Sequence, residues 1–235
     1  MGLKTAEKNY TTELAKGFVA GFIILGSLIL SLMLFDIYSL HSGRNITLDA
    51  VIILVIKAII TGLAVGVIEE TLFRGAILTG LMKRSNAVIA TITVSLVYAA
   101  AHFIDYHPQA TDQLNWLSAP AMFLDAYSGI FNPEILDALI ALFLLGILLS
   151  LVRLRTGNII QCIGLHAGLV AAIKISRYFT QYDPDNRFSY LVSSHDHRLG
   201  WLAVFWLGLA IGIYYTFRIR GKADWSNAKR SPSVG

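Results

Sequence analysis

Ionisable side chains suited to acid–base chemistry lie within or beside long apolar stretches of this chain. Glu69 and Glu70 follow one such stretch and are themselves followed by Arg74, while His102 and His166 lie in two others. An Asp, Lys or Arg side chain at the centre of a bilayer costs about 2.5–3.5 kcal/mol, so charged residues are rarely kept there without a function. Two carboxylates and two imidazoles inside a membrane therefore predict proton transfer to and from a bound water or substrate.

Helical spacing separates the two glutamates into different roles. Glu70 and Arg74 are four residues apart, so on a helix they share a face and can form an ion pair. Glu69 projects about 100° away from Glu70 and remains available for other chemistry. A solvated charge cluster at the end of a helix is the alternative interpretation. The pattern favours Glu69 as a general base, with Glu70 and Arg74 as supporting residues.

Both histidines have small neighbours that leave room beside the imidazole. Tyr98 precedes His102 by four residues, and the three alanines between them let a neighbouring helix come close. His166 is followed by an alanine and a glycine within another apolar run. Either imidazole alone could be a structural group. Together with the glutamate pair they predict one site, in which Glu69, His102 and His166 are catalytic and Tyr98 is supporting.

Other reactive side chains are weaker candidates. His195, Asp196 and His197 lie in a hydrophilic stretch that gives no preformed set of metal ligands, so we expect a solvated loop there. Cys162 is the single cysteine, which excludes an intrachain disulfide and a cysteine-rich zinc site. Because it lies in an apolar run, we expect an inert, buried thiol.

The composition is that of an integral membrane protein. Of the 235 residues, 55% are hydrophobic and 14% are charged, against about 25% charged in soluble domains, and the mean hydropathy is +0.62. The net charge of +4 lies in short segments beside apolar runs, without a basic face interleaved with aromatics, so we expect no nucleic-acid partner. We predict an all-α, polytopic helical bundle that forms a single membrane domain over residues 1–235.

A membrane-spanning helix needs about 20 apolar residues. Six segments are long and apolar enough: 17–35, 49–68, 86–104, 135–152, 157–176 and 199–217. A seventh apolar segment, 71–82, is too short to span by itself, so we predict six to seven spans. The first is uncharged over a longer stretch than the core of a signal peptide, so we interpret it as a retained span.

The distribution of Lys and Arg predicts the orientation. These residues concentrate in 1–16, 74–84, 153–155 and 218–230, whereas 105–134 has none. The positive-inside rule then places both termini in the cytoplasm, with 218–235 as a basic tail and 105–134 as an external loop. The membrane would be the plasma (inner) membrane.

The second span must be irregular if Glu69 is to meet His102. Glu69 precedes Lys83 by about 21 Å of helix, so segment 69–83 should also enter the membrane. We therefore predict an irregular or broken helix around 62–84, either a prolonged helix or a partial hairpin.

Three motifs in this order resemble those of the CPBP family of intramembrane glutamic endopeptidases. They are EETLFR at 69–74, YAAAH at 98–102 and HAGLV at 166–170, and the resemblance covers about 65–175. The family includes CAAX-processing (type II prenyl) and bacteriocin-processing, Abi-like members. Two positions depart from the pattern: Tyr98 stands where Phe is commoner, and Val170 stands where the family usually has Asn.

The resemblance implies a mechanism. Glu69 with His102 would activate a water for attack on a peptide carbonyl, and His166 would donate to the oxyanion. Glu70 and Arg74 would hold the helix in place. The missing Asn would be a second oxyanion donor, and the loss of one such donor costs about 10²–10³ in rate. The substrate would be a lipid-anchored tail, a membrane peptide or a leader sequence, with no cofactor.

Three alternatives stay open at this point. Glu69, His102 and His166 could hold Zn²⁺ in an open site, although the sequence has no HExxH motif. The scaffold could also serve a non-catalytic immunity or regulatory protein, which Val170 would favour. In a proton-coupled carrier Glu69 and Glu70 would be relay groups, but the chain shows no inverted repeat.

Overall fold

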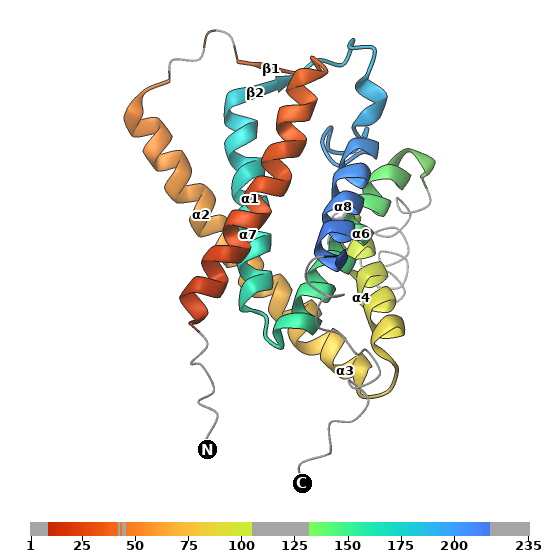
Figure 1. Ribbon diagram of the computed structural model, residues 1–235. Coiled ribbons are helices and arrows are strands. Elements are labelled where there is room, and N and C mark those ends of the chain that lie inside the picture. Colours follow the sequence, from red (N-terminus) through yellow and green to blue (C-terminus); the bar gives the residue numbers. More distant parts are fainter. Residues whose placement is uncertain (1–8, 42, 44–45, 105–131, 217–235) are drawn as a thin grey trace, which may run out of the picture.

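The structure is a computed structural model that describes residues 9–41, 43, 46–104 and 132–216. It is almost entirely helical, as predicted, with one small antiparallel sheet (Figure 1). The predicted external segment 105–134 lies mainly outside the described residues, and the predicted basic tail 218–235 lies wholly outside them.

The helices are α1 (Tyr10–Leu34), α2 (Leu48–Glu70), α3 (Leu78–Met82), α4 (Ala87–Ala101), α6 (Leu136–Thr156), α7 (Ile160–Phe179) and α8 (Trp201–Tyr214), with the π-helix η1 (Thr71–Ile77) and the short 3-10 helices Pro133–Ile135 and Ser189–Leu191. The strands are β1 (Tyr38–Leu40) and β2 (Thr180–Tyr182).

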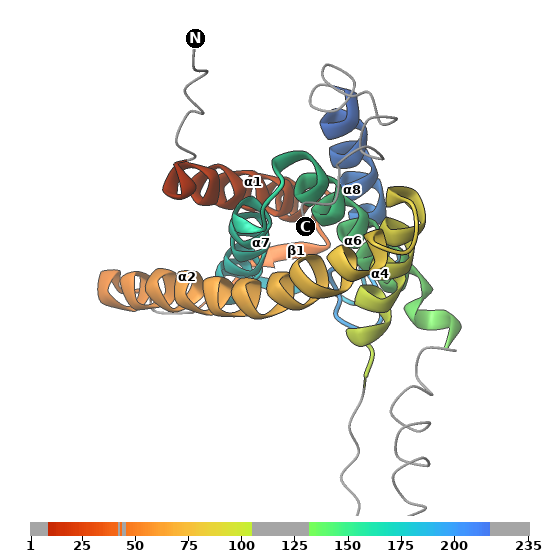
Figure 2. The same cartoon turned by 90° about the horizontal axis from the view of Figure 1, so that it is seen from below.

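The helices form two groups that meet at the candidate site. Helix α7 lies between α1 and α2, and α4, α6 and α8 pack beside them (Figures 1 and 2). Glycines set the close contacts of α7. A Cβ added to Gly21 of α1 would lie 2.0 Å from the Leu165 carbonyl oxygen, and one added to Gly62 of α2 would lie 2.5 Å from that of Ala167. Because no side chain separates these backbones, α7 holds His166 directly beside α2.

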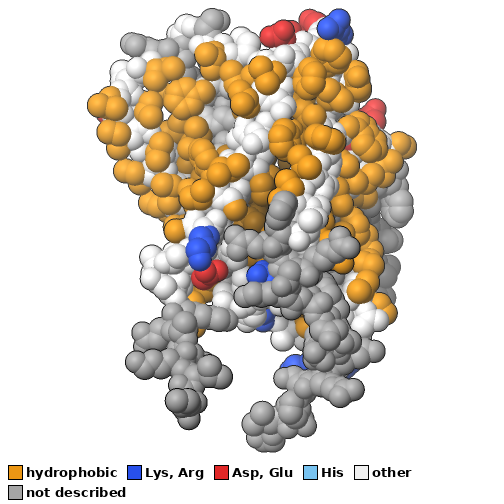
Figure 3. All heavy atoms as spheres, in the orientation of Figure 1, with side chains coloured by type: hydrophobic (Ala, Val, Ile, Leu, Met, Phe, Trp, Pro, Cys, Tyr) orange, Lys and Arg blue, Asp and Glu red, His pale blue; other side chains and the backbone are white. Residues whose placement is uncertain are grey.

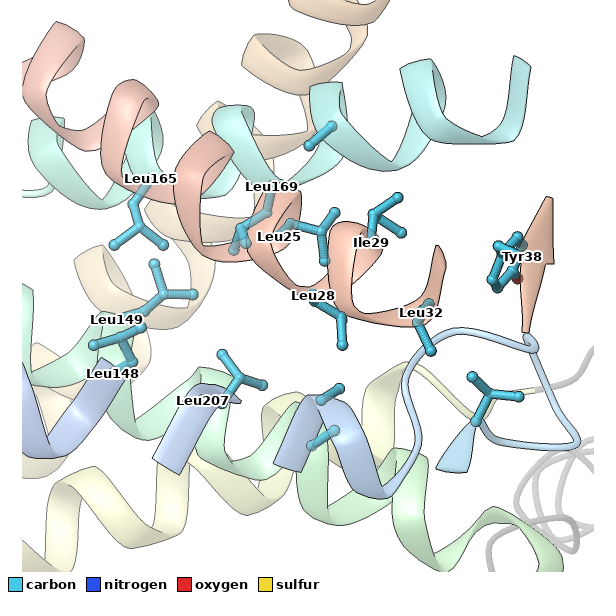
Figure 4. Close-up of a cluster of buried hydrophobic side chains, with 14 of the residues drawn as sticks. Leu25, Leu28, Ile29, Leu32, Tyr38, Leu148, Leu149, Leu165, Leu169 and Leu207 are labelled. Atoms are coloured by element: carbon cyan, nitrogen blue, oxygen red, sulfur yellow. The ribbon is translucent and has the colours of Figure 1, made fainter. Parts of the chain in front are cut away.

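Two clusters of buried hydrophobic side chains hold the groups together. The larger joins α1, α6, α7 and α8, and includes Leu28, Leu149, Leu165 and Leu207 (Figure 4). The second packs Phe73 of η1 and Leu78 of α3 against Val94 and Tyr98 of α4 and Leu142 of α6. The second cluster thus fixes the segment that follows the glutamate pair.

The second apolar helix is irregular, as predicted. It runs without a break over Leu48–Met82, 35 residues in all, and changes to π-helical geometry at Thr71, directly after Glu70. The Thr79 hydroxyl donates to the Arg74 carbonyl oxygen at 3.2 Å, which helps to satisfy the backbone of the widened turn. The partial-hairpin alternative is wrong, because the segment continues the helix instead of turning back.

Three helices in the described part of the chain are long and apolar enough to cross a membrane: Tyr10–Leu34, Leu48–Met82 and Pro133–Thr156. Helices α4 and α8 are apolar but have only 15 and 14 residues. The prediction of six to seven spans is therefore not confirmed, although a helix lies at each predicted position. Figure 3 shows one face of the molecule largely covered by hydrophobic side chains. Charged side chains lie near the upper edge of this face and in its lower half, an arrangement that suits contact with lipid.

Candidate active site

A buried ion pair lies at the junction of α2 and η1. Arg74 Nη1 donates to Glu70 Oε1 at 3.1 Å, and both side chains are fully buried. Arg74 Nη2 donates to the Gly146 carbonyl oxygen of α6 at 3.2 Å. The guanidinium also lies over the Tyr98 ring, 4.4 Å from its centroid. The predicted Glu70–Arg74 pair is confirmed, and Arg74 also ties the two helix groups together.

Glu70 also contacts His166, a link that the sequence did not predict. His166 Nδ1 lies 2.9 Å from Glu70 Oε1. A carboxylate can only accept hydrogen bonds, so Nδ1 carries the proton in this contact. Nε2 is then the acceptor in the neutral imidazole and a donor only in the imidazolium. Glu70 thereby sets the tautomer of His166.

Glu69 points toward both imidazoles. Its Oε2 atom lies 3.9 Å from His102 Nε2 and 3.8 Å from His166 Nε2. Atoms at these separations can both lie about 2.8 Å from one water oxygen. Glu69 Oε2 is buried and has no hydrogen-bond partner among the described residues. Buried polar atoms rarely lack a partner, so this oxygen marks a place for water or substrate.

Tyr98 and the end of α4 orient His102. His102 Nδ1 lies 2.9 Å from the Tyr98 carbonyl oxygen, which can only accept, so Nδ1 is the donor. In the neutral ring, Nε2 then has its lone pair directed toward Glu69. The Tyr98 ring lies 4.6 Å from the His102 ring and 6.5 Å from the His166 ring, centroid to centroid. Tyr98 thus contacts both imidazoles and the Arg74 guanidinium.

A cavity of about 140 Å³ adjoins the two imidazoles. His102, His166 and Tyr98 are among its lining residues, and most of the rest of the lining is aliphatic. Val170, one helical turn beyond His166 on α7, also lines it. A side-chain amide at position 170 would therefore reach the same cavity, whereas valine offers it no hydrogen-bond donor.

The side chains that were weaker candidates in the sequence make packing contacts and hydrogen bonds outside the candidate site. The exposed His195 ring packs against Phe103 at 5.1 Å, and the exposed His197 ring stacks on Tyr182 at 4.6 Å. Asp196 accepts hydrogen bonds from two backbone N–H groups of its own loop. The Cys162 thiol is buried and donates to the Leu149 carbonyl oxygen at 3.3 Å. These contacts agree with the predicted solvated loop and buried thiol.

Metal ligation was the open alternative for the three catalytic candidates. Among the residues that the structure describes, no group of three or more His, Cys, Asp or Glu side chains is arranged to hold a metal ion.

The comparisons with known proteins point to one family. A family model described as type II CAAX prenyl endopeptidase, Rce1-like, matches residues 51–172, a little over half of the chain. This segment contains Glu69, Glu70, Arg74, His102 and His166. No curated protein and no solved structure matches the chain.

Proposed function

The chain belongs to the Rce1-like family of type II CAAX prenyl endopeptidases. We propose that it hydrolyses a peptide bond of a membrane-associated or lipid-modified substrate, and that Glu69 and His102 activate the attacking water. The membership confirms the resemblance to the CPBP family. Together with the apolar helices, it makes the chain an integral membrane protein of CAAX-protease type. The proposed chemistry rests on one observation, the unpaired Glu69 oxygen that faces two imidazole nitrogens.

In the proposed reaction, a water binds between Glu69 Oε2 and His102 Nε2. Glu69 accepts a proton from this water while the water oxygen attacks the carbonyl carbon of the substrate. A tetrahedral intermediate forms with negative charge on the former carbonyl oxygen. The C–N bond then breaks, and the proton held at Glu69 passes to the leaving amine. The products are a shortened chain with a new carboxylate and the released peptide.

His166 supplies the electrostatic stabilisation in this proposal. Because Nδ1 donates to Glu70, Nε2 can donate to the oxyanion only while the ring is an imidazolium. Glu70 stabilises that cation at 2.9 Å, and Arg74 holds the Glu70 carboxylate in place. A charged donor of this kind is suited to an oxyanion in a low-dielectric site.

The substrate class follows from the surroundings of the site. The cavity beside the imidazoles is lined largely by aliphatic side chains, which favours a membrane-inserted peptide or a lipid-modified tail over a free hydrophilic peptide. Prenylated CAAX tails, bacteriocin-type leaders and other lipidated peptides are the members of this class to compare. We place the protein in the plasma (inner) membrane with both termini in the cytoplasm, on the distribution of Lys and Arg.

Glu69→Gln tests the proposal, because glutamine keeps the size of the side chain but cannot accept the proton. In proteoliposomes with lipid-modified peptides, we expect cleavage to fall by about 10²–10⁴-fold with the thermal unfolding temperature unchanged. Glu134→Gln is the matched control, since Glu134 is an exposed carboxylate outside the site. Wild-type cleavage should also persist with a zinc chelator such as 1,10-phenanthroline.

Full activity of Glu69→Gln would overturn this mechanism. Absence of cleavage by the wild-type protein, with peptide binding retained in Glu69→Gln, would favour the second candidate, a non-catalytic immunity or regulatory protein. The aliphatic Val170 side chain in the cavity wall is the observation that supports this second function.

A further inference from the structure

A groove runs between α1 and α8, away from the glutamates. A cavity of about 560 Å³ near the start of α1 and another of about 410 Å³ further along share four lining residues: Ala20, Ile23, Gln161 and Tyr214. Because the two cavities share these walls, they are adjacent, and together we call them the α1–α8 groove. Helices α1 and α8 lie side by side here without close packing (Figures 1 and 2).

The two ends of the α1–α8 groove differ in chemistry. At its start it is lined by Lys16 and Arg155, the latter in the last turn of α6. The Lys16 ammonium pairs with Glu13 at 2.9 Å, whereas Arg155 has no acidic partner among the described residues. Beyond them the lining is mainly aliphatic and ends near Ser27 and Trp206. The groove is therefore cationic at one end and apolar along the rest.

The distance from its cations to its far end matches one leaflet of a membrane. Lys16, at the cationic end, and Ser27, at the far end, are separated by about 16 Å along α1. Half of a bilayer's hydrocarbon core is about 15 Å. A single acyl chain of ordinary length therefore fits between the cationic end and Trp206.

We propose that the α1–α8 groove binds an anionic phospholipid, with its phosphate at Arg155 and Lys16 and one acyl chain along the groove. Charge complementarity selects an anionic over a zwitterionic headgroup, because the phosphate of a zwitterionic lipid is offset by the lipid's own ammonium group and would leave the net positive charge at Arg155 uncompensated. The proposal does not depend on the endopeptidase chemistry, since neither Glu69 nor the imidazoles line the groove.

The distal end of the groove adjoins the candidate active site. Ile24 and Trp206 line both the groove and the cavity beside His102 and His166. The Trp206 indole is held in place by donating Nε1–H to the Ser31 hydroxyl at 3.2 Å. The end of the acyl chain would thus pack against the wall of the catalytic cavity without entering it.

Native mass spectrometry of the full chain, released from nanodiscs of phosphatidylglycerol and phosphatidylcholine, tests the proposal. We expect wild-type protein to retain one phosphatidylglycerol in preference to phosphatidylcholine. Arg155→Gln should lower this preference roughly five-fold, the effect of one basic residue at a membrane surface. Arg153→Gln is the matched control: it removes the same charge from the same turn of α6, but Arg153 lines a different cavity, beside α3.

A second variant separates the groove from simple surface charge. Ala20→Phe fills the shared wall of the two cavities and leaves both cations unchanged, so retention of phosphatidylglycerol should be lost while the unfolding temperature stays near that of wild type. Equal losses in Arg155→Gln and Arg153→Gln would overturn the proposal, as would unchanged retention in Ala20→Phe or no preference between the two lipids in wild type.

Discussion

Glu70 carries a function beyond that of an ion-pair partner. One of its oxygens accepts from Arg74 and from His166, so a single buried carboxylate orients an imidazole and neutralises a guanidinium. Removing one member of a buried ionic network leaves its partners uncompensated, typically at a cost of about 3–5 kcal/mol. The Glu70–Arg74–His166 set is therefore a structural unit as well as the support of the proposed oxyanion donor.

Val170 stands where the motif that this chain resembles usually has Asn, and it offers a gain-of-function test. Asn at this position would bring an amide N–H to the cavity lined by His166. If His166 alone stabilises the oxyanion, Val170→Asn should raise kcat by up to about 10²-fold, the usual effect of one added donor.

Val170→Ala is the control for this experiment, because it enlarges the cavity without adding a donor and should give no increase. An unchanged kcat in a folded Val170→Asn variant would argue against an oxyanion site at this wall. The peptide cleavage assay proposed for Glu69→Gln provides the measurement.

At the scale of the element, helix α7 depends on glycines in its two neighbours. The Gly21 position leaves no room for a methyl group, whereas an added Cβ on Gly26 of the same helix would meet nothing within 4 Å. Gly21→Ala should therefore force α1 and α7 apart and lower the free energy of unfolding by about 1–3 kcal/mol.

The Gly26→Ala control should change stability by no more than about 1 kcal/mol, in the stabilising direction that helix propensity predicts. Thermal unfolding of both variants in the same detergent measures the difference. Equal unfolding temperatures for the two would contradict the close α1–α7 packing.

The sequence predicted the elements better than their contacts. Apolar runs near 20 residues long located every major helix, and the order of the three motifs indicated the site. Two features lay beyond such reasoning. Glu70 and His166 are 96 residues apart, so no spacing rule relates them. Arg74, in the π-helix that begins at Thr71, donates to the Gly146 carbonyl oxygen of α6, a contact that exists only after α6 has packed.

The number of membrane spans is another property that the sequence alone did not determine. Hydropathy treats α4 and α8 as full spans, yet the structure describes them as 15 and 14 residues long, which is shorter than a bilayer core requires.

For the whole molecule, the proposed orientation can be tested at its two ends. Lys83 follows α3, and Asp185 follows β2 at the opposite end of the bundle (Figure 1); both are exposed. The native thiol of Cys162 is buried, so it adds little background to labelling. With the termini in the cytoplasm, a membrane-impermeant maleimide should label Asp185→Cys in intact cells and Lys83→Cys only after lysis.

The reverse labelling pattern would invert the topology. Labelling of both positions in intact cells would show instead that one of the apolar helices between them does not cross the membrane.

The position of α7 late in the chain has a consequence for biosynthesis. Glu70 and Arg74 leave the ribosome within a turn of each other and can neutralise one another before the second helix enters the bilayer. Their imidazole partner is synthesised 96 residues later, and the helix that carries it is also the main neighbour of both α1 and α2. The earlier helices are therefore synthesised before the helix that packs against both of them, and the candidate site is complete only when the last third of the chain is being made.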